Sequence, residues 1–386
     1  MADASAVAAY TRSVLLARRR AEMRVHAVAV IGDVVVCGTS LGTLGLWLLD
    51  LKESREDLPA RVVDCGSAVY ALAWCESAGA LAVGCDGGAA VLDWQAVESF
   101  VRHNSSPVDW DATPPLAITL AQPQRHVLRN GAVAPLSECN ALAWDGGRLW
   151  GGSGDGTISC WTLGESPRLV AHFAAHPEMV LSLAWAPAAR TLASASEDGT
   201  VALWDGDSLE LKTRIGPIAH ILEAKGVIPA AAQLRCWVGG VVVDDSARWV
   251  ACAGGLEAKG EAPVAKSPGG WVATFHAATG ALVRGTKTTA PCRCVAADGS
   301  ELVVGGDDST LRAWPLRDPH ARSNEPARSV PLHARAAFSV FVSRPPAQTG
   351  ENDDDDFGSS ALIFAAGAAP LVDVCSESNH LFSLKF

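Results

Sequence analysis

The sequence predicts an all-β protein, a seven-bladed β-propeller with a short N-terminal helix, and two observations carry this prediction. The first is a repeated unit: "ALAW" at residues 71–74 returns at 141–144, and "SLAW" follows at 182–185. The second is the pattern after each copy, which is a β-rich run, a Gly/Asp turn and a third run ending in a tryptophan. These tryptophans are Trp94, Trp161 and Trp204. Short antiparallel strands joined by hairpins therefore recur along the chain.

Weaker copies extend the array to seven units and set the expected domains. Seven units in 386 residues average about 55 residues each, longer than the ~40–45 of a typical blade, so several connections must carry insertions. Residues 1–23 are expected to form a helical segment, the only stretch with helical periodicity, and residues 24–386 the propeller. The approximate blades expected are 24–65, 66–136, 137–174, 175–236, 237–288, 289–335 and 336–386. The insertions expected are 95–136, 206–235, 256–269 and 344–360.

The last unit predicts how the ring closes. It contains apolar runs for all four of its strands in one continuous piece ending in "HLFSLKF", and the residues before Arg24 have a helical pattern. We therefore expect the first and last blades to meet by side-chain packing alone, without a strand exchanged between the two ends of the chain.

Charge and cysteine usage narrow the function classes. The chain has 31 Lys and Arg against 42 Asp and Glu, a net charge of −11, which disfavours a broad nucleic-acid-binding surface. Its 11 cysteines are scattered without a CxxC pair, which indicates reduced thiols packed as small hydrophobic side chains. No secretory signal pattern and no membrane-spanning apolar run is recognised. These features predict a protein of the cytosol or the nucleus.

The stretch "SASEDGTVALWD" (194–205) follows a histidine in "AHPEMV", so a serine, a histidine and an acid lie close together. One interpretation is a catalytic nucleophile with its base, but Ser194 lies within an apolar strand rather than in a cleft. The other interpretation is a hydrogen-bond relay in which Trp204 donates to Ser194, Ser194 to His176, and His176 to Asp198. This pattern resembles the structural tetrad of WD-repeat proteins, and no catalytic residue is expected.

Other units keep parts of this pattern. Asp155 and Trp161 stand at the same interval as Asp198 and Trp204, and so do Asp308 and Trp314, but Gly151 and Val304 occupy the serine position. Positions that keep the acid and the tryptophan but lose the serine are not copies of an active site. The tryptophans Trp47 and Trp94 are interpreted as the blade signatures of the first two units.

Four further motifs favour structural explanations. "GGSGDG" (151–156) lacks the lysine of a phosphate-binding loop, and His172 and His176 lack the helix and acid of a zinc motif. Cys292 and Cys294 alternate on one face of a strand, where buried thiols are common. The acidic run Asp353–Asp356 is typical of a solvated loop, with partner contact as the alternative. No cofactor and no metal site is predicted.

Three longer stretches resemble the THO complex subunit 6 family of WD-repeat proteins. They are "PLSECNALAW" (135–144), "WVGGVVVDDSARWVACAGG" (237–255) and "AAGAAPLVDVCSESNHLFSLKF" (365–386). The resemblance spans most of the chain in order, although the insertions here differ in length and are rich in alanine.

The resemblance implies a non-enzymatic docking subunit of the THO complex, which acts in mRNA processing and nuclear export. Its implied partners are the coiled-coil THO subunits 5 and 7, its implied location is the nucleus, and little direct RNA binding is expected. The alternative is a substrate receptor of a cullin-type ubiquitin ligase, whose members carry an arginine two residues after the WD aspartate. Here Asp205 is followed by Gly206 and Asp207, which disfavours that alternative. In the insertion 95–136, Trp110 and Arg125 are candidate partner contacts.

Overall fold

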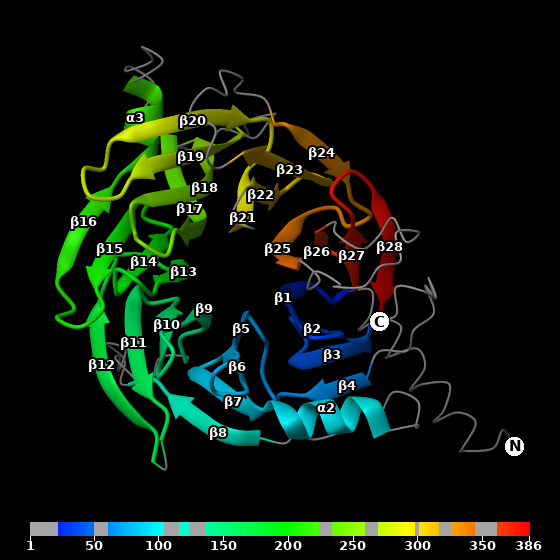
Figure 1. Cartoon of the computed structure of the whole chain (residues 1–386). Coiled ribbons are helices and arrows are strands. Elements are labelled where there is room, and N and C mark those ends of the chain that lie inside the picture. Colours follow the sequence, from blue (N-terminus) through cyan, green and yellow to red (C-terminus); the bar gives the residue numbers. More distant parts are fainter. Residues whose placement is uncertain are drawn as a thin grey trace, which may run out of the picture.

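The computed structural model describes residues 22–49, 61–103, 116–123, 136–164, 166–223, 234–258, 269–297, 301–315, 326–343 and 361–386. These residues form seven antiparallel four-stranded sheets arranged in a ring, with the first strand of each sheet nearest the centre (Figure 1). The predicted seven-bladed β-propeller is therefore confirmed. The expected N-terminal helical segment, except for its last two residues, lies outside the described residues.

Each blade uses four strands that are consecutive in the sequence. The first four blades consist of β1 (Val25–Ile31), β2 (Val34–Thr39), β3 (Thr43–Leu48) and β4 (Arg61–Asp64); β5 (Ala71–Cys75), β6 (Ala80–Cys85), β7 (Gly88–Asp93) and β8 (Leu116–Ala121); β9 (Cys139–Trp144), β10 (Arg148–Ser153), β11 (Thr157–Thr162) and β12 (Arg168–Ala174); and β13 (Val180–Ala186), β14 (Thr191–Ser196), β15 (Val201–Asp205) and β16 (Leu211–Ile215).

The other three blades complete the ring. They consist of β17 (Leu234–Val243), β18 (Trp249–Ala258), β19 (Gly270–His276) and β20 (Leu282–Thr288); β21 (Cys292–Ala297), β22 (Glu301–Gly306), β23 (Thr310–Pro315) and β24 (Arg328–Pro331); and β25 (Ala337–Ser343), β26 (Leu362–Gly367), β27 (Leu371–Cys375) and β28 (His380–Lys385).

The fifth blade begins before the boundary expected at residue 237. Strand β17 starts at Leu234, and Arg235 and Cys236 pair with Glu257 and Leu256 of β18. Because β17 and β18 are both ten residues long, their hairpin extends further than those of the other blades.

Two helices lie outside the predicted helical segment, so the expectation of helical periodicity only near the N-terminus was wrong. Helix α2 (Trp94–His103) connects β7 to β8, and α3 (Pro217–Glu223) follows β16. Trp94, Val97 and Val101 of α2 are buried in a core shared by the first two blades. These residues are spaced at i, i+3 and i+7, the apolar period of a surface helix, and the helix continues into the insertion expected at 95–136.

The ring closes between the first and last blades without strand exchange among the described residues. The last sheet consists of β25, β26, β27 and β28 in order. Val25, Val28 and Trp47 of the first blade share a core cluster with Phe364 and Val374 of the last.

The expectation that the first and last blades meet by side-chain packing alone was wrong, because a hydrogen bond also joins them. The backbone N–H of Val28 donates a hydrogen bond to Ser339 Oγ of the last blade at 3.2 Å. The seam between the fourth and fifth blades has the same bond, from the N–H of Val241 to Ser182 Oγ, also at 3.2 Å. A serine in the first strand of one blade thus binds the first strand of its neighbour.

Ser339→Ala should lower the free energy of unfolding by about 1–3 kcal/mol, because the N–H of Val28 then loses its acceptor at a partly buried seam. Ser182→Ala is the matched variant at an internal seam and should cost a similar amount. Chemical denaturation of both variants and the unaltered chain measures this. If the midpoint of unfolding were unchanged for Ser339→Ala but lowered for Ser182→Ala, ring closure would not depend on the bond between Val28 and Ser339.

Candidate functional site

The structure brings His176, Ser194, Asp198 and Trp204 into one hydrogen-bonded chain in the fourth blade. The indole Nε1–H of Trp204 donates to Ser194 Oγ at 2.9 Å, and Ser194 Oγ lies 2.8 Å from His176 Nε2. His176 Nδ1 lies 2.9 Å from Asp198 Oδ2. A carboxylate can only accept a hydrogen bond, so His176 Nδ1–H donates to Asp198. In the neutral imidazole, Nε2 is then the acceptor of the serine hydroxyl. These hydrogen bonds connect the loop before β13 to β14, to β15 and to the turn between those two strands.

Although a Ser–His–Asp arrangement is present, its setting is not that of a nucleophile. Ser194 has no exposed surface, and it already accepts the indole N–H of Trp204. A substrate carbonyl could not approach a hydroxyl that is enclosed in this way. The arrangement can hold a loop, two strands and the turn between them together, which is a structural task.

The surroundings of Asp198, the acid at the end of this series of hydrogen bonds, favour its ionised carboxylate. Burial opposes ionisation of Asp198, but hydrogen bonds from His176 and Thr200 outweigh it, and the pKa of the carboxyl is lowered. Arg214 adds a cation 3.7 Å from the same carboxylate and donates to the Ala175 carbonyl at 2.8 Å.

The other blades solve the same problem with different residues. In the third blade Trp161 donates to the Ala121 carbonyl at 3.3 Å, and Asp155 accepts from the Thr157 hydroxyl at 2.6 Å. In the sixth, Asp308 pairs with Arg312 at 2.5 Å instead of with a histidine. The indole N–H groups of Trp47 and Trp314 have no hydrogen-bond partner among the described residues. Within this part of the chain, the complete tetrad occurs in the fourth blade alone.

Trp94 does not occupy the signature position of the second blade. Trp204 lies opposite Leu192 in the strand pairing, and the residue in the corresponding place, opposite Leu81, is Leu92. Trp94 instead begins α2, where its ring contacts Trp74 edge-on with the ring centroids 5.4 Å apart. A helix directly after β7 placed a tryptophan near the expected interval without placing it in the strand.

The centre of the ring is a channel lined by the first strands of all seven blades. Its cavity volume is about 180 Å³, below the ~300–1,000 Å³ of typical small-molecule pockets. Residues that contribute side chains to its lining include His26, Tyr70, Asn140, Ser182, Arg293 and Phe338.

Five of these blades contribute to a continuous run of aromatic and arginine side chains, which we call the channel cluster: Tyr70, His26, Phe338 and Arg293, which line the channel, and the buried Trp237 beside Arg293. The ring of His26 lies 5.6 Å from that of Tyr70 and 6.2 Å from that of Phe338. The guanidinium of Arg293 lies 5.8 Å from the Phe338 ring and 5.3 Å from the Trp237 ring. Each contact joins neighbouring blades, so the cluster is held by the ring itself.

The charges of the channel cluster are partly balanced. Arg293 donates to both carboxylate oxygens of Asp307, yet its side chain remains 44% exposed. Burial, followed by the nearby charge of Arg24, lowers the pKa of His26 and favours the neutral imidazole. Burial, followed by Asp86, raises the pKa of Tyr70 to about 12, so the phenol stays protonated and donates to Asp86 at 3.1 Å.

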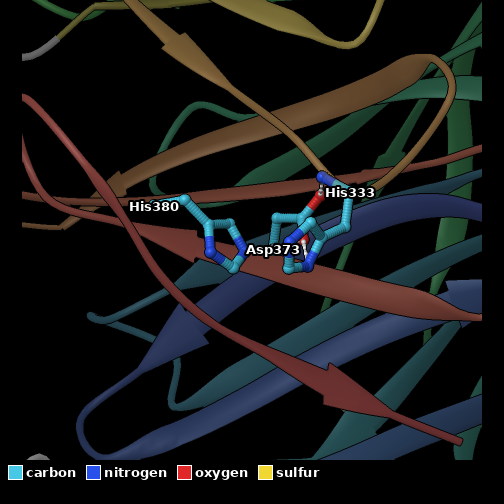
Figure 2. A group of neighbouring side chains, drawn as sticks. All are labelled: His333, Asp373 and His380. Atoms are coloured by element: carbon cyan, nitrogen blue, oxygen red, sulfur yellow. Dashed lines mark hydrogen bonds and ion pairs between the residues drawn. The ribbon is translucent and has the colours of Figure 1, made fainter.

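A second polar cluster lies in the last blade, and the sequence did not predict it. His333 in the loop before β25, Asp373 in β27 and His380 in β28 direct ring nitrogens and a carboxylate oxygen toward one another (Figure 2). Asp373 is fully buried, whereas the side chain of His333 is 65% exposed. His333 is 40 residues from Asp373 in the sequence, whereas His380 faces Asp373 through the pairing of β27 with β28.

Several predicted residues have other outcomes. Trp110, Arg125 and Asp353–Asp356 lie outside the described residues. His172 bonds to Ser159 at 2.9 Å, whereas His176 belongs to the tetrad. The two histidines are therefore not directed at one common metal ion. Residues 151–156 form the end of β10 and the turn before β11.

The 11 cysteines are all free thiols. Burial raises the pKa of each of the most enclosed ones, to about 12 for Cys65, Cys160, Cys236, Cys294 and Cys375. Such thiols are poor nucleophiles and poor metal ligands, because both tasks require the thiolate. Among the described residues, no helix is long and apolar enough to cross a membrane.

Comparisons with known proteins agree with this architecture. Residues 167–205 match the family model "WD domain, G-beta repeat", a segment that runs from β12 to β15 and contains all four tetrad residues. No curated protein sequence matches the chain. Among solved structures, the WD40 β-propeller domain of Doa1 has a TM-score of 0.59 at 17% identity, covering 92% of this chain and 93% of that one. The computationally designed Ika8 protein has a TM-score of 0.55 at 16% identity, covering 94% of this chain and 87% of that one.

These findings support a relationship to the WD-repeat family through one recognisable repeat, and the structural likeness shows the fold. WD-repeat propellers typically serve as non-enzymatic scaffolds for protein–protein interactions, and the channel cluster and the enclosed tetrad fit that role.

Trp204→Ala should cost roughly 3–5 kcal/mol of stability, because a buried ring that packs on Phe173 is lost. His176→Ala should cost about 1–3 kcal/mol, because it removes the buried imidazole that links Ser194 to Asp198 and both of its hydrogen bonds. His276→Ala is the control: the side chain of this histidine bonds to nearby Thr279 and lies edge-on to the exposed Trp249, so its effect should stay within about 0.5 kcal/mol. Thermal and chemical melts test the set, and melting midpoints for Trp204→Ala and His176→Ala equal to the control would refute a stabilising tetrad.

Proposed function

We propose that this chain is a non-enzymatic docking subunit of a THO-type complex in the nucleus, where it holds helical subunits during mRNA processing and export. The observation that carries this proposal is the channel cluster, a set of aromatic and arginine side chains fixed by five blades of a rigid ring. Aromatic residues and arginine supply most of the binding energy in protein interfaces. The resemblance of residues 135–144, 237–255 and 365–386 to the THO complex subunit 6 family supports the choice of complex and points to the coiled-coil subunits 5 and 7 as partners.

Arg293 is the residue of the cluster best suited to bind a partner. Its guanidinium is oriented by Asp307 and stacked beside Phe338 and Trp237, so little side-chain entropy remains to be lost on binding. Because it keeps exposed donors, an acidic side chain on a partner helix can bind beside the aromatic rings.

The ligase-receptor alternative has less support. The residue two positions after Asp205 is Asp207, and its carboxylate binds Arg190 at 2.5 and 2.6 Å. An arginine is the residue that would support a receptor role there, and this position carries the opposite charge, already engaged by a neighbour.

Arg293→Glu should weaken capture of co-expressed THO subunits 5 and 7 by at least about tenfold, the loss expected for a residue that contributes more than ~1.4 kcal/mol to an interface. Arg190→Glu is the matched control, because this arginine is also exposed and paired with one aspartate. Affinity capture from co-expressing cells, with melting curves to verify folding, measures the effect. No capture by the unaltered chain would contradict the choice of complex; equal capture by all three proteins would contradict the role of the channel cluster.

The isolated chain should bind single-stranded RNA weakly, with a Kd no tighter than about 1–100 μM at physiological salt. Its net charge is −11, so few Lys and Arg side chains are free to neutralise phosphates and release their counterions. Fluorescence anisotropy with a labelled RNA measures this. Nanomolar binding at that salt would argue that the chain contacts RNA directly rather than through its partners.

A further inference from the structure

The polar cluster of the last blade has the composition of a metal site. His380 Nε2 lies 3.0 Å from Asp373 Oδ1, and His333 Nδ1 lies 3.9 Å from the same oxygen. All three ligand atoms lie within 4.8 Å of one another. Imidazole and carboxylate are the ligands that Zn²⁺ takes in three-ligand sites with an open fourth position.

The spacing is close to what a tetrahedral ion requires. With Zn–N and Zn–O bonds of ~2.0–2.2 Å, neighbouring ligand atoms lie about 3.3 Å apart. The two observed distances from Asp373 Oδ1, 3.0 Å to His380 Nε2 and 3.9 Å to His333 Nδ1, lie on either side of this value. His333 can move closer to Asp373, because it comes from an exposed loop.

The surroundings of Asp373 are those of an oriented ligand. Its Oδ2 accepts the backbone N–H groups of His333 and Ala334 at 3.0 and 2.9 Å, which leaves Oδ1 directed at the two imidazoles. Outer hydrogen bonds of this kind fix the orientation of metal-ligating carboxylates.

Ser383 lies at the centre of the cluster. Its Oγ is 2.6 Å from Asp373 Oδ1, 3.0 Å from His333 Nδ1 and 3.1 Å from His380 Nε2. The hydroxyl donates its single proton to Asp373 Oδ1, so a nitrogen of His333 or His380 can bond to its oxygen only as a protonated N–H donor. An ion bound beside it would receive lone pairs from all three, and the hydroxyl oxygen or a water would complete the tetrahedron.

We propose that His333, Asp373 and His380 form a binding site for one Zn²⁺ ion that fastens the loop before β25 to β27 and β28. In the fourth blade, His176 stands at the corresponding place before β13 and fastens its loop through the tetrad. The last blade has Ala365 in the position of Ser194 and Cys375 in that of Trp204, so it cannot form that relay. The metal site would add a side-chain connection to the backbone hydrogen bonds that already join this loop to Asp373 in the blade that closes the ring.

The test uses the full chain, stripped of metal by a chelator and then dialysed. Isothermal titration with ZnCl₂ should give one ion per chain, and the melting temperature should rise with Zn²⁺. His333→Ala should weaken binding by at least about 100-fold, since loss of even an outer-shell partner costs 10–100-fold. This variant should fold, because the side chain is exposed and the backbone N–H of residue 333 is kept.

His276→Ala is the matched control and should bind Zn²⁺ as the unaltered chain does. Co²⁺ should give the visible bands of a four-coordinate ion. Failure of the unaltered chain to bind Zn²⁺, or undiminished binding by His333→Ala, would each overturn the proposal. None of these outcomes bears on capture of THO subunits.

Discussion

The constraint on which the rest of the structure depends is that each sheet is apolar on both faces. The second strands β2, β14 and β26 are buried along their whole length, so each needs a neighbouring sheet on both sides. A single four-stranded sheet of this kind could not remain in water, and only a closed ring covers every face. The cluster that joins Val25 and Trp47 to Phe364 and Val374 is therefore as necessary as any internal one, although its residues stand at opposite ends of the chain.

Close packing between the sheets explains some of the glycines. A Cβ at Gly38 would lie 2.2 Å from Cγ1 of Val69 in the next blade, and one at Gly152 would lie 2.4 Å from Cγ1 of Val180. Both glycines stand in the second strand of their blade, where the first strand of the neighbour approaches. Any side chain there would force the sheets apart.

Packing of this density makes every enclosed polar group costly unless it is bonded. The fourth blade bonds its tryptophan through the tetrad and the third through a carbonyl acceptor, whereas in the sixth blade Asp308 pairs with Arg312 and the Trp314 N–H has no partner among the described residues. This variety explains why a single repeat, residues 167–205, matches the family model although all seven sheets have the same topology. The fold depends on apolar alternation, which tolerates many sequences, whereas the family pattern depends on four particular side chains.

The same distinction explains what could be predicted from the sequence. Repeated strands and turns indicated seven blades, and local spacing placed His176, Ser194, Asp198 and Trp204 on one relay. Spacing alone misplaced Trp94, because it does not show that α2 begins directly after β7. The channel cluster and the group around Asp373 could not be predicted, since each joins residues from several blades or from a loop and two strands. Their contacts follow from ring closure, which no local pattern encodes.

Ring closure therefore also determines what the molecule can do. Tyr70, His26, Phe338, Arg293 and Trp237 come from five blades, and each has its neighbour only when the ring is shut. An open or loosened ring would separate His26 of the first blade from Phe338 of the last, and the cluster would divide at that seam. Contacts made in this way are preorganised when the propeller is intact, because the ring fixes both members of each pair. The Val28–Ser339 bond joins the two closing blades, so it stabilises the seam across which the channel cluster is assembled.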